Sequence, residues 1–208
     1  MTSLLFHANH ARTMAGFLSV EETLELCAGN AVLDPLSLLV SFGVEIGKGN
    51  TFFPNIVIER RDNSKISIAD NNVFASNIKI MASGTGQIHI GSTNEFGDGG
   101  VILKANRDGA HISIGNAGRY LGGLEVFGRS RLGHGSQILG RISVLDCDLE
   151  DGESYRYNDP DMRAAVLKGH GTARSIRLKK GEVLNGLGNF DIENIERQTL
   201  YHQKLNND

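Results

Sequence analysis

Apolar residues return at every sixth position through the middle of the chain. Counting in steps of six from Ile46, with four extra residues after Ile58, four after Ile80 and six after Ile102, meets an apolar or aromatic side chain each time. These positions are Ile46, Phe52, Ile58, Ile68, Phe74, Ile80, Ile90, Phe96, Ile102, Ile114, Tyr120, Val126, Leu132, Ile138 and Val144. A helix repeats about every 3.6 residues and a strand about every two. The longer period therefore indicates a solenoid of repeating units.

The residues between these positions repeat as well. A small residue follows the first member of each triplet, at Gly47, Ala69, Gly91, Gly115 and Gly133. Two residues before the second member stand Asn50, Asn72, Asn94, Gly118 and Ser136. Six residues make one short strand and one corner, and three such sides make a triangular coil whose copies stack about 4.8 Å apart. The apolar residues would fill the prism, the small residues would permit the corners, and the asparagines would form a ladder.

The sequence predicts an all-β solenoid of about five to seven triangular coils with a helix at each end. Residues 1–43 are expected to form a helical N-terminal cap, residues 44–190 the β-helix, and residues 191–208 a C-terminal helix. Ser19 and Glu22 have the spacing of a capping box at the start of a helix. Turn-rich insertions are expected at 59–65, 81–87 and 103–111, all at one corner, and a long acidic loop at 145–162. The six-residue pattern can then resume at Val166, Thr172, Leu178, Leu184 and Phe190.

Several stretches resemble a known family. "IGKGNT", "IGSTNE", "IGNAGR" and "LGHGSQ" resemble the hexapeptide repeat of left-handed parallel β-helix proteins, most of which are acyltransferases. Residues 31–59, "AVLDPLSLLVSFGVEIGKGNTFFPNIVIE", are similar to the start of the β-helix domain in the bifunctional N-acetylglucosamine-1-phosphate uridyltransferase/glucosamine-1-phosphate acetyltransferase family. The left hand is implied by this resemblance, because crossover statistics alone favour the right hand.

Composition excludes some classes of function. The 208 residues carry a net charge of −3, which argues against nucleic acid or an anionic membrane as the main partner. There is no apolar run long enough to span a membrane. The first residues, "MTSLLFHANHART", lack the charged start of a signal peptide. Cys27 and Cys147 are far apart and form no paired motif, so two reduced thiols in a cytoplasmic protein are expected.

The resemblance implies an acyl-CoA-dependent acyltransferase that forms a homotrimer. Acetyl or another acyl group would pass from acyl-CoA to a hydroxyl or amine of a sugar or amino sugar, and a nucleotide sugar is among the candidate acceptors. In such enzymes a histidine commonly serves as the general base, since its pKa lies near neutrality. A backbone amide typically stabilises the oxyanion, and cationic side chains hold the phosphates of CoA.

Two histidines are the candidate catalytic residues. His111 ends the insertion "NRDGAH", where Asp108 could orient its ring, although a solvated loop histidine is the simpler interpretation. His134 lies between glycines in "LGHGS", which leaves room for a ligand, although corners of this repeat are rich in glycine anyway. His170 is expected in the position of the asparagine ladder, and His89 is expected to be a plain surface residue.

The candidate cofactor-binding residues lie in "ARSIRLKKGE". Arg174, Arg177, Lys179 and Lys180 could hold the phosphates of CoA. Arg177 and Lys179 share a strand face because they are two residues apart. The alternative is an ordinary solvated strand or a partner for the acidic loop.

Two other functions remain open. A non-catalytic scaffold or assembly protein could use the same prism. A metal-dependent hydratase would resemble the γ-class carbonic anhydrases, which place two histidines five residues apart with a third one coil away. No histidine pair in this sequence has that spacing, so no metal is expected.

Overall fold

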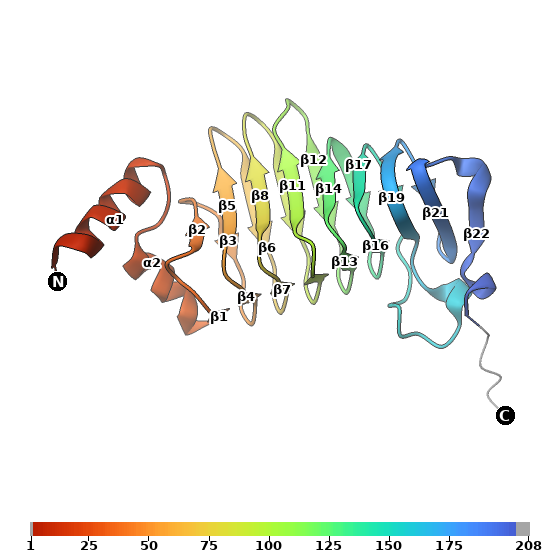
Figure 1. Ribbon diagram of the computed structural model, residues 1–208, viewed down its shortest axis with the longest axis horizontal. Helices are drawn as coiled ribbons and strands as arrows, with labels where there is room; N and C mark the ends of the chain where they lie inside the picture. Colours follow the sequence, from red (N-terminus) through yellow and green to blue (C-terminus); the bar gives the residue numbers. More distant parts are fainter. Residues whose placement is uncertain (1, 203–208) are drawn as a thin grey trace.

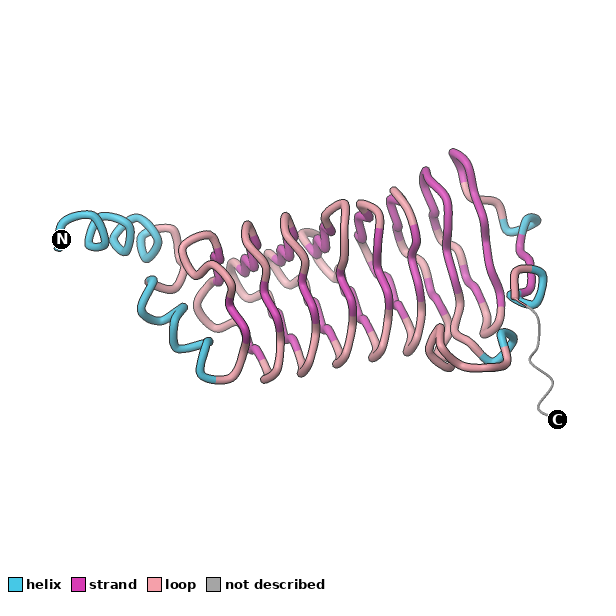
Figure 2. Tube along the Cα trace, turned by 60° about the horizontal axis from the view of Figure 1, so that its bottom comes forward, coloured by secondary structure: helices cyan, strands magenta, loops and turns pink. Residues whose placement is uncertain are grey.

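The chain forms a left-handed parallel β-helix capped at both ends. The computed structural model describes residues 2–202 (Figure 1), and the coils stack in one direction between the N-terminal helices and the C-terminal turns (Figure 2). All solenoid strands pair in parallel with the equivalent strands of the neighbouring coils. The predicted fold class is therefore confirmed in its solenoid part. No helix in the described range has both the length and the apolar character needed to cross a membrane.

Three faces make up the prism. Face 1 is the seven-stranded sheet of β3 (Glu45–Ile46), β6 (Lys65–Ile68), β9 (Gln87–Ile90), β12 (His111–Ile114), β15 (Arg129–Leu132), β18 (Asp148–Leu149) and β20 (Arg177–Leu178). Face 2 comprises β1 (Ala31–Val32), β4 (Thr51–Phe52), β7 (Val73–Phe74), β10 (Glu95–Phe96), β13 (Arg119–Leu121) and β16 (Gln137–Leu139). Face 3 comprises β2 (Leu38–Val40), β5 (Ile56–Arg60), β8 (Ile78–Ala82), β11 (Val101–Ala105), β14 (Leu124–Phe127) and β17 (Ile142–Leu145). The long strands β19 (Val166–Arg174) and β21 (Glu182–Asn189) continue faces 2 and 3 together.

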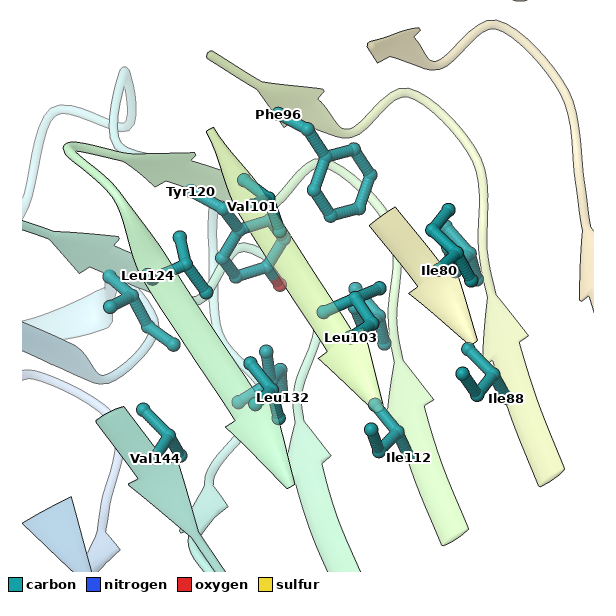
Figure 3. Close-up of a cluster of buried hydrophobic side chains, with 14 of the residues drawn as sticks. Ile80, Ile88, Phe96, Val101, Leu103, Ile112, Tyr120, Leu124, Leu132 and Val144 are labelled. Carbon is teal, nitrogen blue, oxygen red and sulfur yellow. The ribbon is translucent and has the colours of Figure 1, made fainter. Parts of the chain in front are cut away.

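Stacked side chains fill the interior, as Figure 3 shows for the middle coils. The rings of Phe52, Phe74 and Phe96 are parallel, with centroids 5.1 and 5.0 Å apart, and Tyr120 continues the stack at 5.2 Å. The amide nitrogen of Asn72 donates to the Asn50 side-chain oxygen at 3.0 Å, and Asn94 donates to Asn72 at the same distance. The predicted asparagine ladder is thus present, and it satisfies polar groups that the core buries.

The inward register differs from the prediction at one place in the third coil. Val101 and Leu103 are buried, whereas Ile102 points outward and is half-buried. Leu103 pairs with Ile80 on one side and Val126 on the other. The turn at 97–100 contains one residue more than its counterparts, and a shift of one residue moves a strand side chain to the opposite face.

The long excursion also lies elsewhere than predicted. Residues 148–149 form β18, with Leu149 fully buried, so the loop spans 150–165 and contains the 3₁₀ turn Pro160–Met162. It leaves from the corner between faces 1 and 2, whereas the shorter insertions leave from the corner between faces 3 and 1. After it, Leu167 and Ala173 take the inward positions predicted for Val166 and Thr172. The predicted Leu178 and Leu184 are buried.

The N-terminal cap begins with α1 (Thr2–Met14) and α2 (Val20–Glu25), followed by the 3₁₀ turn Leu26–Ala28. The capping box of Ser19 and Glu22 is confirmed, with both of its hydrogen bonds formed. Arg12 of α1 is buried and donates to the backbone oxygen of Leu38 at 2.5 Å, which joins the helix to the first coil. Strands β1 and β2 already stack on that coil, so the solenoid starts before the predicted residue 44.

The predicted C-terminal helix is wrong for the residues that the structure describes. Residues 192–200 form the 3₁₀ turn Ile192–Asn194, the strand β22 (Ile195–Arg197) and the 3₁₀ turn Gln198–Leu200. Strand β22 pairs antiparallel with β21. The last coil would otherwise present an open strand edge, and a paired strand covers it more directly than a helix would. The remainder of the predicted helix, 203–208, lies outside the described residues.

Candidate functional site

The corner between faces 3 and 1 contains a step. The turns at 61–64, 83–86 and 106–110 rise there as a ridge, and the tallest of them joins β11 to β12 (Figure 1). In the following coils the same corner is short and is made by Gly128, Asp146 and Ser175. The change in height leaves a recess beside the third turn of the ridge, which we call the corner cavity.

The corner cavity has two adjoining compartments. The first, of about 530 Å³, is lined by Arg107, Asp108, Gly109, Ala110, Gly128, Arg129, Leu145, Asp146, Ser175 and Arg177. The second, of about 250 Å³, is lined by Lys104, Asn106, Arg107, Ala110, Phe127, Gly128 and Leu145. Because they share lining residues, the two compartments form one recess with a polar part and a more apolar part.

Three arginines and two carboxylates set the charge of the polar compartment. Arg129 is held in place, because its Nε donates to the Gly109 oxygen at 2.8 Å and its backbone amide donates to Asp146 Oδ1 at 2.8 Å. Arg177 is more exposed, since 84% of its side chain is accessible to solvent, and its guanidinium lies 3.7 Å from an Asp148 carboxylate oxygen. Arg107 is exposed on the ridge side. Guanidinium groups arranged in this way suit a ligand that carries phosphate or carboxylate groups.

The structure separates the four predicted cofactor-binding residues. Arg177 lines the cavity, and Arg174 ends β19 in register with Leu145, which also lines it. Lys179 and Lys180 lie beyond face 1 at the next corner, where their backbone amides donate to Glu182 and Glu150, each at 2.8 Å. Arg107 and Arg129 were missed, because only stacking brings residues of successive coils together.

His111 lies at the edge of the corner cavity. It is exposed, it directly follows the lining residue Ala110, and it pairs in register with Arg129. The expected orienting contact with Asp108 is replaced by others. The Asp108 carboxylate lies 3.3 Å from Thr85 Oγ1, and the His111 ring packs against His89 with centroids 5.3 Å apart.

His134 belongs to a hydrogen-bonded ladder along the corner between faces 1 and 2. Its Nδ1 accepts from the backbone amide of Asn116 at 2.9 Å, and its own amide donates to Asp151 Oδ1 at 2.7 Å. The Asn116 side chain accepts in the same way from the Ser92 amide at 2.7 Å. A backbone N–H can only donate, so Nδ1 of His134 is unprotonated and the proton of the neutral ring is on Nε2.

The fold separates the two predicted catalytic histidines. His111 begins a strand of face 1 and His134 follows the end of the next one, so the two residues lie at opposite edges of that face.

Two further histidines differ from their expected roles. His170 is exposed and pairs with Leu187 in β21, so it is not a member of the asparagine ladder. His89 is half-buried and hydrogen-bonded to Ser67, which is more than a plain surface residue.

The described part of the chain contains no ready-made metal site. Within residues 2–202 no three His, Cys, Asp or Glu side chains are grouped closely enough to hold a metal ion. His89 and His111 lie side by side, but no third ligand completes a site with them in this range.

The comparisons with known proteins show a likeness to solved structures. No protein-family model matches the chain, and no curated protein matches it either. Among solved structures the chain is similar to LpxA from Acinetobacter baumannii, with 12% identity over 77% of this chain and 70% of that one, at a TM-score of 0.31.

Proposed function

We propose that this protein is an acyl-CoA-dependent acyltransferase that works at the corner cavity. The acyl group, acetyl or longer, would pass to a hydroxyl or amine of a sugar or amino sugar. The observation that carries the proposal is the junction of a histidine with an arginine-lined cavity. His111 follows Ala110 directly in the chain, and Ala110 lines both compartments.

The charge of the cavity supports a donor with several phosphates. CoA carries a pyrophosphate and a further phosphate, and guanidinium groups bind such oxygens through paired hydrogen bonds. Arg107, Arg129 and Arg177 come from three different coils. Their spacing therefore follows the stacking of the coils, which suits an extended ligand lying along the solenoid axis.

His111 is the better of the two predicted bases. A general base needs a ring nitrogen that can reach the acceptor, and geometry decides this before pKa does. The Nδ1 of His134 is already bonded to the Asn116 amide, whereas His111 is exposed and directly follows the lining residue Ala110. Arg129, one strand away from His111, would place a positive charge near the oxyanion that forms during transfer.

Ligand binding is the first test. At a hundredfold excess over Kd, acetyl-CoA should stabilise the folded protein by about 2.7 kcal/mol, which raises the melting temperature by about 5–10 °C. The double variant Arg107→Ala/Arg177→Ala should bind acetyl-CoA at least about tenfold more weakly, because it loses two charge-assisted contacts. Arg61→Ala is the matched control, since Arg61 is exposed at the same corner two turns earlier. The absence of any shift with acetyl-CoA or longer acyl-CoAs would contradict the proposal.

The catalytic role needs a second experiment. His111→Gln should leave the Kd for acetyl-CoA unchanged and lower transfer to a panel of amino sugars by about 100-fold or more, as release of the CoA thiol would report. His134→Gln is the comparison, because glutamine retains an acceptor for the Asn116 amide. Loss of transfer in His134→Gln alone would assign the base to His134 instead.

We also propose that the protein acts in the cytoplasm as a homotrimer. The corner cavity is open along one side, and a neighbouring prism would close it around the ligand and the acceptor. Light scattering on the purified protein tests this arrangement, and a monomer that binds acetyl-CoA with full affinity would contradict it.

A non-catalytic scaffold is the second candidate, and face 2 favours it. Leu33, Phe53 and Val73 are 57%, 39% and 40% exposed along this face. Exposed apolar rows of this kind are typical of surfaces that bind another protein. A scaffold would bind no acyl-CoA, and Phe53→Ser would abolish its assembly while leaving the prism folded.

A further inference from the structure

Four polar side chains form a two-by-two group on the outer surface of face 1. Lys65 and Ser67 project outward from β6, and Gln87 and His89 project outward from β9, because the residues between them fill the core. The strand register places Lys65 beside Gln87 and Ser67 beside His89. The group lies one to two coils before the last of the ridge turns, and none of its four residues lines the corner cavity.

The hydrogen bonds within the group define the protonation of His89. The Ser67 hydroxyl lies 2.7 Å from His89 Nδ1, and His89 Nε2 lies 3.4 Å from Gln87 Oε1. The amide oxygen of Gln87 can only accept, so Nε2 carries the proton and Nδ1 is left to accept from Ser67. A hydroxyl donates to an unprotonated ring nitrogen, and a third side chain fixes the orientation of the ring.

The surroundings of His89 favour its neutral form. Partial burial lowers the pKa of His89, and the neighbouring His111 of β12 and Lys65 of β6 lower it further, while Glu45 of β3 opposes them. The neutral ring is the form that can take a proton from a hydroxyl. An adjacent base of this kind is the usual means of activating a serine.

We propose that Ser67 is a nucleophile that accepts an acyl group from activated esters and thioesters, with His89 as its base and Gln87 as a positioning residue. The Ser67 oxygen forms a bond to the carbonyl carbon while its proton passes to His89 Nδ1. The bond from that carbon to the leaving oxygen or sulfur then breaks, and the leaving group takes the proton from His89. Water, or an acceptor hydroxyl or amine, repeats these steps in reverse to release the acyl group.

Lys65 completes the arrangement. Its ammonium lies on the same face as Ser67, two residues earlier on the strand, and its charge acts on His89. A positive charge near the carbonyl oxygen stabilises the oxyanion that forms when Ser67 attacks. This activity goes beyond the proposed CoA-dependent transfer, because it requires neither the corner cavity nor CoA.

Labelling with a small activated ester tests the proposal without CoA. Wild-type protein incubated with p-nitrophenyl acetate should release nitrophenol in an initial burst and gain one acetyl group, which peptide mass spectrometry should locate on Ser67. Ser67→Ala and His89→Gln should each lower the burst at least about 100-fold. Ser113→Ala is the matched control, since Ser113 is the other register neighbour of His89 and should leave the burst unchanged.

The pH profile separates a catalytic base from a merely structural histidine. The burst rate should follow the neutral form of His89 and reach half its maximum below pH 6.5, the ordinary histidine value, because the pKa of His89 is lowered. The Gln87→Ala variant should shift the pH at which the burst rate is half-maximal. The Gln87→Glu variant should shift that pH to a higher value. Acetylation of wild type at lysine only, an unlabelled Ser67, or an equal burst in Ser67→Ala would overturn the proposal. Retained acetyl-CoA binding in these variants would show that the CoA-dependent function stands independently.

Discussion

The first three coils and the last three share the six-residue repeat but differ in how regularly they stack. In the first three, each coil repeats the one before it after 22 residues, and phenylalanine and asparagine stack on their own kind. In the later coils the corner turns are shorter, the loop 150–165 interrupts the six-residue repeat, and charged side chains gather on the outer surface. The comparison teaches that regular stacking stabilises the prism, whereas the cavity arises where the stacking changes.

The largest expected effect comes from breaking the regular stack. Phe74 is fully buried between two parallel rings, so Phe74→Ala should lower the free energy of unfolding by about 3–5 kcal/mol. Phe127, half-buried beside the corner cavity, is the counterpart in the later region, and Phe127→Ala should cost about 1 kcal/mol. Urea denaturation of both variants measures the difference, and equal losses would contradict the distinction between the two regions.

The polar ladder gives the next largest effect. Asn72→Ala removes a donor and an acceptor from the centre of the buried ladder and leaves its neighbours unsatisfied, at a cost of about 2–4 kcal/mol. Ser136 occupies the same position of a later coil, and its hydroxyl lies 3.0 Å from the Tyr120 hydroxyl. Ser136→Ala should therefore cost about 1 kcal/mol. Thermal unfolding of the two variants checks this. A larger loss of stability in Ser136→Ala than in Asn72→Ala would contradict the view that the ladder of the first coils contributes more.

Glycines at the corner between faces 2 and 3 sharpen the comparison within the later coils. Gly140 has φ +127°, and a Cβ there would lie 1.9 Å from the Gly169 oxygen. Gly188 has φ +84° but nothing within 4 Å of its Cβ position. Gly140→Ala should cost more than about 2 kcal/mol and Gly188→Ala about 1 kcal/mol. Comparable melting temperatures for the two variants would show that close stacking of these corners is not required.

The smallest expected effect is the pH dependence carried by His89. Its pKa is lowered in the folded state, mainly by partial burial, so the folded protein takes up this proton less readily than the unfolded chain. The contribution of the neutral His89 ring to the free energy of unfolding is therefore complete above the unfolded pKa of 6.5. It is lost as the pH falls through the lower pKa of the folded state. His89→Gln should flatten this part of the stability profile, as denaturation between pH 5 and 8 would show.

The sequence predicted the prism because its core obeys a strict period. Leu178 and Leu184 took their expected inward positions, whereas Ile102 did not, since a single extra residue in the turn before β11 changed the register. The helix predicted for residues 191–208 is wrong in the part that the structure describes, because helical spacing could not reveal that Ile195 pairs with Leu184 at an open sheet edge.

The candidate site was less accessible to sequence reasoning. Arg107, Arg129 and Arg177 are widely separated in the chain and meet only because successive coils of unequal length stack. The pairing of Ser67 with His89 had a usable signal, since both positions alternate with core isoleucines in adjacent coils. That signal becomes specific only once the register between the two strands is known.

A crystal structure of the protein with bound CoA would test the central claim most directly. The account predicts phosphate oxygens within hydrogen-bonding distance of Arg107, Arg129 and Arg177, with the thiol end directed toward His111. CoA seated instead on face 2 beside Phe53, or at the corner that carries Lys179 and Lys180, would contradict the claim that function lies where the repeat changes.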